Sequence, residues 1–178
     1  KVCAIYQDDD FGLEVLKGTE EGLKAARLTL TDKASFKRGA TDFSSQVAKM
    51  QASGCELVVP GTIIRETVGT IGTARKMGFN PVFLGSSAAY TDLIHKIGGK
   101  ATEGFYATMT AQFPYADDPS PAVRRWATKY RTQFNEDPSV ISVFGYTAVN
   151  MFATAMRDAG ARPTPAKFIR AMEFAQIP

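Results

Sequence analysis

Histidine and cysteine are scarce in this sequence, which contains one histidine, His95, and two cysteines, Cys3 and Cys55. A metal site made of cysteine and histidine needs three or four ligands, so these residues offer little material for one. A catalytic triad could use only His95. Two cysteines do not make a disulfide framework. We expect both to be buried free thiols, because Cys3 lies within a predicted strand and Cys55 just before one.

A strong charge of one sign is also missing, since 21 basic and 18 acidic residues leave a net charge of +3. This excess is too mild and too scattered to favour nucleic acid as a partner. Residues 138–156 carry no charge, but they include serine, asparagine and threonine, which favours a buried helix over a membrane span. The 178 residues, 44% of them hydrophobic, suffice for one ordinary domain with a real core.

The first two-thirds of the chain alternates short apolar runs with segments of helical periodicity. Central parallel strands are apolar without interruption, and residues 57–59, Leu-Val-Val, have this character. The alternation predicts an α/β fold with a doubly wound parallel sheet. The predicted strands are residues 2–6, 28–36, 57–59, 82–84 and 104–110.

The pattern changes near residue 112, after which helices are predicted and strands are not. One helix begins at Ser120-Pro121, a second runs from Ser139 to about residue 159, and a third begins at Thr164-Pro165. The second helix is apolar nearly all round, so it needs cover on several sides. Nothing else in the chain obviously supplies that cover. We therefore expect a piece of a larger two-lobed protein, trimmed before Lys1.

Three enzyme signatures expected on a doubly wound sheet are absent. The sequence has no Gly-x-Gly-x-x-Gly after the first strand, no P-loop and no Gly-x-Ser-x-Gly elbow. The turn after the first strand instead reads Asp-Asp-Asp-Phe-Gly over residues 8–12, and its carboxylates would repel a pyrophosphate. We expect no enzymatic activity.

The order of the predicted elements and several short sequence motifs together resemble the periplasmic substrate-binding proteins of ABC transporters. The resemblance is to the branched-chain amino-acid type, which has the type I two-lobed fold. The resemblance covers essentially the whole chain. The motifs that carry it are Tyr6–Gly12 (YQDDDFG), Gly39–Ser44 (GATDFS), Gly61–Thr67 (GTIIRET), Ala74–Gly78 (ARKMG), Phe83–Ala88 (FLGSSA), Glu103-Gly104 and Gly145-Tyr146.

The resemblance implies that residues 1–111 are the second α/β lobe, and that residues 112–178 cross the hinge and return helices to an incomplete first lobe. The sheet of that first lobe would lie before Lys1, and one more crossing would lie after Pro178. The implied function is the solute-binding component of an ABC importer, without a cofactor or a metal. Its partners would be a small solute and a membrane permease, not nucleic acid. The location would be periplasmic, or extracellular and membrane-anchored in a Gram-positive organism.

A ligand-sensing domain of a receptor or transcription regulator remains an alternative function, because fold alone does not separate it from a transport protein. An enzyme on a doubly wound sheet is a weaker alternative. A signal peptide in the flanking sequence would favour transport, and a DNA-binding headpiece would favour regulation.

Ligands of open α/β sheets bind beyond the carboxyl ends of the strands, and residues 6–12 are such an end. We expect Asp10 to cap the following helix, with Asp8 and Asp9 near its positive N-terminus, rather than a metal site. By resemblance, Phe11 lines the cleft; its alternative is packing on its own helix.

Two further strand ends supply candidate ligand contacts. Thr62 could cap a helix or face the cleft, and Ile63 stands where branched-chain amino-acid binders often carry an aromatic residue. Arg65 could bind a carboxylate bidentately or pair with Glu66 or a neighbouring acid. Ser86 and Ser87 suit a cleft as small polar residues, or a simple turn and helix cap.

The candidate site also predicts a ligand class. Binders of branched-chain amino acids offer the ligand's ammonium an acid, commonly from the loop after the fourth strand, because a buried unpaired ammonium is costly. By resemblance, that acid would stand at Ser87, which is neutral. An aromatic or aliphatic carboxylate is therefore slightly preferred over a branched-chain amino acid.

Overall fold

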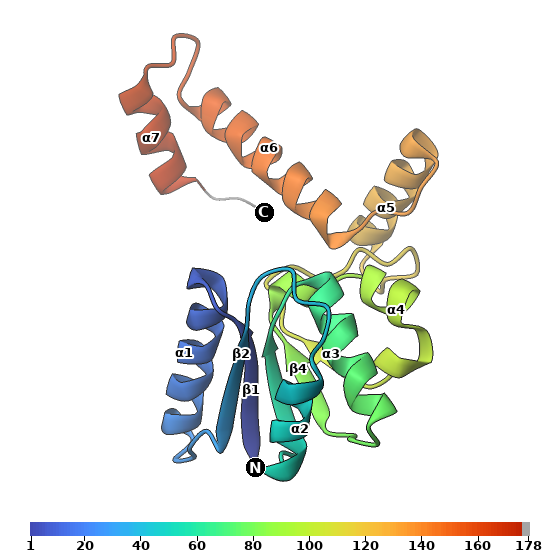
Figure 1. Cartoon of the computed structure of the whole chain (residues 1–178). Helices are drawn as coiled ribbons and strands as arrows, with labels where there is room; N and C mark the ends of the chain where they lie inside the picture. Colours follow the sequence, from blue (N-terminus) through green and yellow to red (C-terminus); the bar gives the residue numbers. More distant parts are fainter. Residues whose placement is uncertain (176–178) are drawn as a thin grey trace. The chain divides into compact units, whose positions relative to one another are not determined.

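A computed structural model describes residues 1–175 of the protein, which forms two compact units, Lys1–Thr110 and Ala111–Pro178 (Figure 1). We call them unit 1 and unit 2. Unit 1 contains all the strands of the described chain. Its elements are β1 (Val2–Gln7), α1 (Asp10–Ala25), β2 (Asp32–Phe36), α2 (Ser44–Ala52), β3 (Leu57–Gly61), α3 (Ile64–Lys76), β4 (Val82–Gly85), η1 (Ser87–Ala89), α4 (Leu93–Gly98), η2 (Gly99–Thr102) and β5 (Phe105–Ala107).

The five strands form one sheet in the order β2-β1-β3-β4-β5, and every neighbouring pair is parallel. The chain reverses its direction of travel across the sheet after β2, which is the mark of a doubly wound fold. The predicted α/β class is confirmed. In the register, Cys3 stands opposite Val58 and Phe83 opposite Phe105, so these side chains share one face.

The main core lies on the face that α2 and α3 cover. Ile5, Val58 and Phe83 project from the sheet and are at most 1% exposed. Phe43 packs against them at the start of α2, edge-on to Phe36, with ring centroids 5.2 Å apart. An added Cβ at Gly69 of α3 would lie 2.7 Å from the Phe43 ring, so the glycine permits this close approach.

Cys3 and Cys55 form a disulfide, so the prediction of two free thiols is wrong. Their Cα atoms lie 5.9 Å apart, within the range that a disulfide can span. The parallel pairing of β1 with β3 brings Cys55, two positions before β3, next to Cys3 near the start of β1, although 52 positions separate the two cysteines. Both remain buried, as the position of each beside a strand indicated.

Two strands are shorter than their apolar patterns predicted. Residues 28–36 were expected to be a strand, but Arg27 adopts a left-handed φ of 59° after α1, and the chain turns before β2 begins at Asp32. Of the strand expected over residues 104–110, only Phe105–Ala107 is a strand in the structure. Only Thr108 continues the pairing, by donating its N–H to the Gly85 carbonyl over 3.0 Å.

The described part of unit 2 contains three helices and no strand; the helices are α5 (Pro121–Phe134), α6 (Val140–Asp158) and α7 (Pro165–Phe174). Ser139 caps α6 in a reciprocal capping box with Ser142, and the Thr164 hydroxyl accepts the Lys167 N–H at α7. Trp126 of α5 packs on Tyr146 of α6, with ring centroids 5.4 Å apart. Among residues 1–175, no helix is long and apolar enough to cross a membrane.

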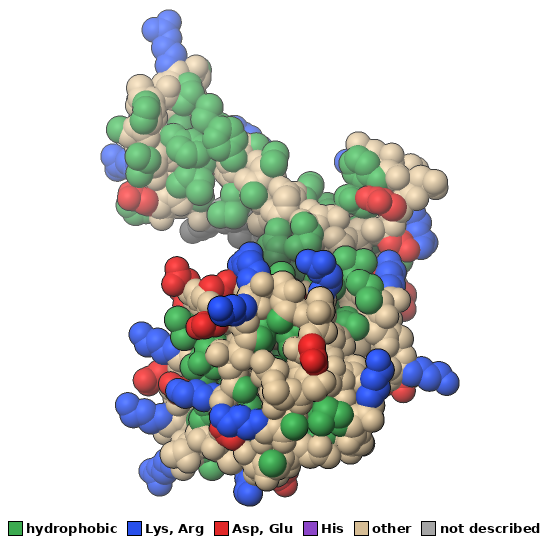
Figure 2. Space-filling model, in the orientation of Figure 1, with side chains coloured by type: hydrophobic (Ala, Val, Ile, Leu, Met, Phe, Trp, Pro, Cys, Tyr) green, Lys and Arg blue, Asp and Glu red, His purple; other side chains and the backbone are tan. Residues whose placement is uncertain are grey.

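Much of the apolar surface of unit 2 is exposed. Figure 2 shows hydrophobic side chains gathered over α6 and α7. Ile141 and Val149 of α6 are 67% and 69% exposed, and no residue of α7 is buried. These helices are ordered locally by their caps, and the described residues of unit 2 leave much of their apolar surface exposed, although an apolar helix requires cover.

Candidate functional site: the carboxyl edge of the sheet

The segments that follow β1, β3 and β4 meet at one edge of the sheet, because these three parallel strands are neighbours. In Figure 1 this carboxyl edge is the end opposite the N label, which marks the start of β1. The three segments carry Phe11, Thr62 to Arg65, and Ser86 to Ser87. The topology thus brings every residue of the predicted site to one edge, which is where ligands of such sheets bind.

Asp9, rather than the expected Asp10, caps α1. Its backbone is extended, with φ −155°, and its side chain accepts the Gly12 N–H over 3.1 Å, whereas Asp10 is already helical. Arg38, from the loop after β2, donates to Asp9 over 2.9 Å, and the Gln7 amide also donates to this carboxylate. The Gly12 hydrogen bond, followed by that from Arg38, holds the pKa of Asp9 below its usual value.

The first turn of α1 presses against the end of β1. An added Cβ at Gly12 would lie 1.9 Å from the Gln7 carbonyl oxygen, so no other residue fits this position without a backbone shift. The preceding Phe11 is half-buried in this turn. Its place at the carboxyl edge is therefore fixed by the Asp9 cap and by the close approach at Gly12.

Thr62 neither caps α3 nor offers its side chain to solvent. Ile63 occupies the N-cap position, and Thr62 is fully buried. The Thr67 hydroxyl donates to the Ile63 carbonyl over 2.7 Å, so in the 2.6 Å contact between the two hydroxyls Thr62 is the donor. In this arrangement the Thr62 hydroxyl ties β3 to α3, while Ile63 is 36% exposed beside it.

Arg65 is exposed and, within residues 1–175, forms no ion pair with Glu66 or any other acid. Glu66 points inward instead, with 2% of its surface exposed and its Oε2 without a hydrogen-bond partner in the described chain. Of the two alternatives for Arg65, pairing with Glu66 is therefore not what the structure shows. Its guanidinium is exposed at the carboxyl edge.

Ser86 and Ser87 have different surroundings. Ser87 is exposed at the start of η1, in a turn where the Ser86 carbonyl accepts the Ala89 N–H. The Ser86 hydroxyl is buried, and within the described residues it has no hydrogen-bond partner. Ser86 lines a groove on the α1 side of the sheet together with Leu84, two positions earlier, as strand alternation requires.

Two residues at this edge were missed by sequence reasoning, since Gln7 and Arg38 both donate to Asp9. Glu66, considered only as a partner of Arg65, is a buried acid. Arg38 lies 29 positions from Asp9, so only the pairing of β2 with β1 brings them together. No three histidine, cysteine, aspartate or glutamate side chains among residues 1–175 converge in a way that could hold a metal ion.

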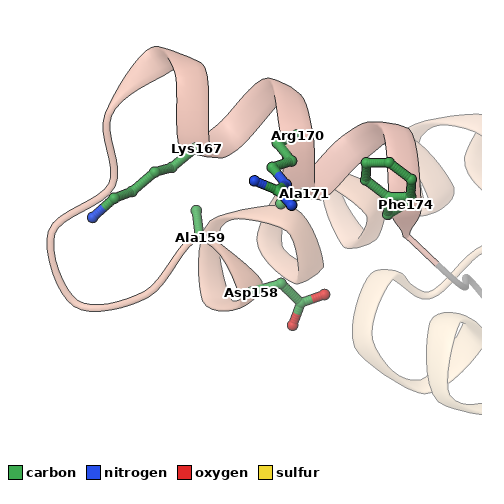
Figure 3. Close-up of a pocket in the computed structure, with 6 residues that line it drawn as sticks. All are labelled: Asp158, Ala159, Lys167, Arg170, Ala171 and Phe174. Atoms are coloured by element: carbon green, nitrogen blue, oxygen red, sulfur yellow. The ribbon is translucent and has the colours of Figure 1, made fainter.

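A separate hollow lies between α6 and α7 in unit 2 (Figure 3). Its volume is about 480 Å³, and it contains none of the predicted ligand contacts. In Figure 3 the Lys167 side chain extends across the loop that joins α6 and α7, and Arg170 projects from α7. The hollow is part of the incompletely covered surface of unit 2, and its lining is Asp158, Ala159, Lys167, Arg170, Ala171 and Phe174.

Comparison with known sequences shows a match over residues 1–178 to the family described as periplasmic binding protein. Leu/Ile/Val-binding protein homolog 8 of Brucella abortus (strain 2308) is 22% identical, covering 100% of this chain and 45% of its own length. Homolog 7 from the same strain is 24% identical over 88% of this chain and 40% of its own length.

Solved structures show the same fold. A substrate-binding periplasmic protein from Ralstonia solanacearum superposes with a TM-score of 0.82 at 26% identity, covering 96% of this chain and 49% of that one. A fatty acid ABC transporter substrate-binding protein from Thermomonospora curvata gives 0.78 at 27% identity, covering 96% and 44%. A leucine binding protein from Thermotoga maritima MSB8 gives 0.83 at 20% identity, covering 96% and 48%. The chain spans about half the length of these proteins.

Proposed function

Because the chain belongs to the periplasmic binding protein family, we propose that it forms one lobe, and part of the other, of the solute-binding component of an ABC importer. The observation that carries the proposal is the carboxyl edge of the sheet. There Phe11, Ile63 and Ser87 stand beyond the ends of three neighbouring strands, Phe11 half-buried and the other two exposed. The names of the Brucella relatives and of the structural neighbours support a binding role and not catalysis.

We propose that the bound solute is an aromatic or aliphatic carboxylate. Arg65 is an exposed cation without an ion pair in the described chain, and Asp9 is already engaged by Arg38. Ser87 is neutral, whereas proteins that bind amino acids would carry at this position an acid that pairs with the ammonium group of the ligand. A branched-chain amino acid is the competing class, because the relatives are named for leucine, isoleucine and valine.

Unit 2 fits the same proposal as a set of helices that belong to the other lobe. Their exposed apolar side chains would pack on a sheet supplied by the part of the polypeptide outside residues 1–178. The protein would act in the periplasm, or outside the cell on a membrane anchor, and would deliver its solute to a membrane permease. The Cys3–Cys55 disulfide supports a location outside the reducing cytoplasm.

A thermal-shift screen of the full-length protein tests the ligand class. We expect aromatic or aliphatic carboxylates to raise the Tm, because binding to the native state stabilises it. Leucine, isoleucine and valine should leave it unchanged. If the amino acids stabilise the protein and the carboxylates do not, the proposed ligand class is wrong. Stabilisation by neither class would contradict the proposed site.

Substitutions at the edge test the assignment of the contacts. Phe11→Ala, Ser87→Ala and Arg65→Gln should each weaken binding of the solute found in the screen, with little effect on Tm in its absence. Lys76→Gln, at the opposite end of α3 from Arg65, is the matched control. Unchanged dissociation constants for all three variants would remove these residues from the site.

A further inference from the structure

Three aspartates, residues 8–10, follow β1 at the carboxyl edge, and the middle one is an ordered charge. Asp9 accepts the Gly12 N–H over 3.1 Å and further hydrogen bonds from Gln7 and Arg38. Its side chain is 29% exposed, whereas both neighbouring aspartates are exposed. The hydrogen bond from Gly12, followed by that from Arg38, lowers the pKa of Asp9. The edge therefore carries one fixed carboxylate that is charged at neutral pH.

A fixed acid at this edge affects which solutes can bind there. It attracts an ammonium group and repels a carboxylate, and both effects are stronger beside a partly desolvated surface than in bulk water. Of the other charges near the strand ends, Arg65 is an exposed cation, while Glu66 is only 2% exposed and does not present a second acid. The preference of the edge for one ligand charge therefore depends on whether Asp9 is neutralised.

The neutralising charge is Arg38, which the turn after β2 brings to Asp9. A backbone hydrogen bond of 2.7 Å keeps the ends of β1 and β2 together. Residues 37–40 then form a tight turn, closed by a backbone hydrogen bond of 3.0 Å, and its third residue, Gly39, has a φ of 83°. A left-handed glycine at this position is typical of a type II turn. Arg38 is the second residue of the turn, and its guanidinium donates to Asp9 over 2.9 Å.

We propose that Arg38 is a specificity-determining residue of the candidate site: by neutralising Asp9, it makes the carboxyl edge favour a carboxylate over a ligand that also carries an ammonium group. This role rests on the proposed function, because it concerns the same site. Arg38 needs no contact with the solute, since it acts through the charge of Asp9. Its side chain is 71% exposed, and exposed ion pairs contribute little to stability, so the pair sets the charge of the edge rather than the stability of the fold.

Matched pairs of probes test this role in the full-length protein. Isocaproate differs from L-leucine, and hydrocinnamate from L-phenylalanine, only by the α-ammonium group. Calorimetry gives, for each pair, the ratio of the dissociation constant of the amino acid to that of the carboxylate. Arg38→Gln leaves Asp9 without its cation and should lower this ratio about fivefold, the size of effect expected for one partly exposed charge.

Three further variants separate the proposed role from other effects. Arg38→Lys keeps the charge, so the ratio should stay within about twofold of the wild-type value. Lys37→Gln removes the same charge one position away, from a side chain without an ion pair in the described chain, and should leave the ratio unchanged. The double variant Arg38→Gln with Asp9→Asn removes both charges, retains a side chain that can cap α1, and should restore the wild-type ratio. All variants should keep the wild-type Tm in the absence of probe.

An unchanged ratio in Arg38→Gln would overturn the proposed role. A double variant that kept the ratio of Arg38→Gln would equally contradict it, because Arg38 would then act on the solute directly. Failure of the proposed ligand class looks different: the wild type would prefer leucine to isocaproate, and a lower ratio in Arg38→Gln would still support the role of Arg38. If none of the four probes bound to the wild type, both the candidate site and the role of Arg38 would be contradicted.

Discussion

Unit 1 and unit 2 use the same kinds of apolar residue and bury them to opposite extents. Ile5 of β1 is fully buried, whereas Ile141 of α6 is 67% exposed. Unit 1 contains a sheet and the helices that pack on it, so its side chains find partners within the chain. The helices of unit 2 have no sheet within the described residues. Whether an apolar side chain of this chain is buried depends on whether a second layer of secondary structure packs on it, and not on the type of residue.

The comparison also separates two sources of helical order. In unit 1, α2 and α3 are held by packing on the sheet through Phe43 and Ile71. In unit 2, α6 and α7 begin at the side-chain caps of Ser139 and Thr164, and few of their residues are buried. A cap stabilises a helix by only about 1 kcal/mol, so unit 2 should be the less stable part of this chain.

Removal of the disulfide should give the largest effect and should be confined to unit 1. Closing a loop between residues 52 positions apart stabilises the folded state by about 4 kcal/mol in the chain-entropy account. Cys3→Ala with Cys55→Ala should lower the unfolding free energy, measured by hydrogen exchange at β1 and β3, by about this amount. Fluorescence of Trp126, the one tryptophan of the sequence, should report an unchanged urea midpoint for unit 2. A common shift would show that the two units unfold together.

A matched pair of isoleucine substitutions sharpens the comparison. Ile5→Ala removes a fully buried side chain and should cost about 3 kcal/mol. Ile141→Ala removes an exposed one, so in the 178-residue chain it should change stability by less than about 0.5 kcal/mol. Urea unfolding, followed by hydrogen exchange for unit 1 and by Trp126 fluorescence for unit 2, measures both. Similar costs at the two positions would contradict the contrast in burial.

The smallest expected effect is a pH dependence of unit 1 at Asp32. The Ser53 hydroxyl, which donates to this carboxylate over 2.6 Å, and Lys49 lower the pKa of Asp32 from 3.8 to about 2. Because the pKa is lowered in the folded state, this stabilisation is complete above pH 4 and is lost as the pH falls towards 2.

Asp32→Asn should therefore remove part of the fall in unit 1 stability between pH 4 and pH 2. The measurement is the unfolding free energy of unit 1 at several pH values across that window. Asp8→Asn, a substitution at an exposed residue of the same unit, serves as the control. An acid dependence identical in the wild type and the Asp32 variant would show that the ion pair does not contribute.

The fold could be predicted from the sequence where local pattern determines structure. Unbroken apolar runs such as residues 57–59 became strands, and Ser120-Pro121, Ser139 and Thr164-Pro165 became helix starts. The disulfide could not be predicted this way, because it depends on which strands are neighbours. Cys3 and Cys55 meet only through the pairing of β1 with β3.

The candidate site was predictable at the level of strand ends and not at the level of single side chains. Phe11, Ile63 and Ser87 stand at the expected edge with exposed surface. Thr62, however, turns inward to Thr67, and Asp9 takes the capping role expected of Asp10. A shift of a strand or of a helix start by one residue changes the direction in which each side chain points. Sequence patterns locate the boundaries of strands and helices less precisely than one residue, so they do not predict that direction.

Hydrogen exchange of the α6 amides, Val140–Asp158, tests most directly the claim that unit 2 lacks a sheet that the full-length protein supplies. The experiment compares the 178-residue chain with the full-length protein under the same conditions, with the amides of β1 and β3 as the internal reference. We expect the α6 amides to exchange rapidly in the short chain and to be protected in the full-length protein, while β1 and β3 are protected in both. Protection of α6 in the short chain equal to that of β1 and β3 would contradict the account.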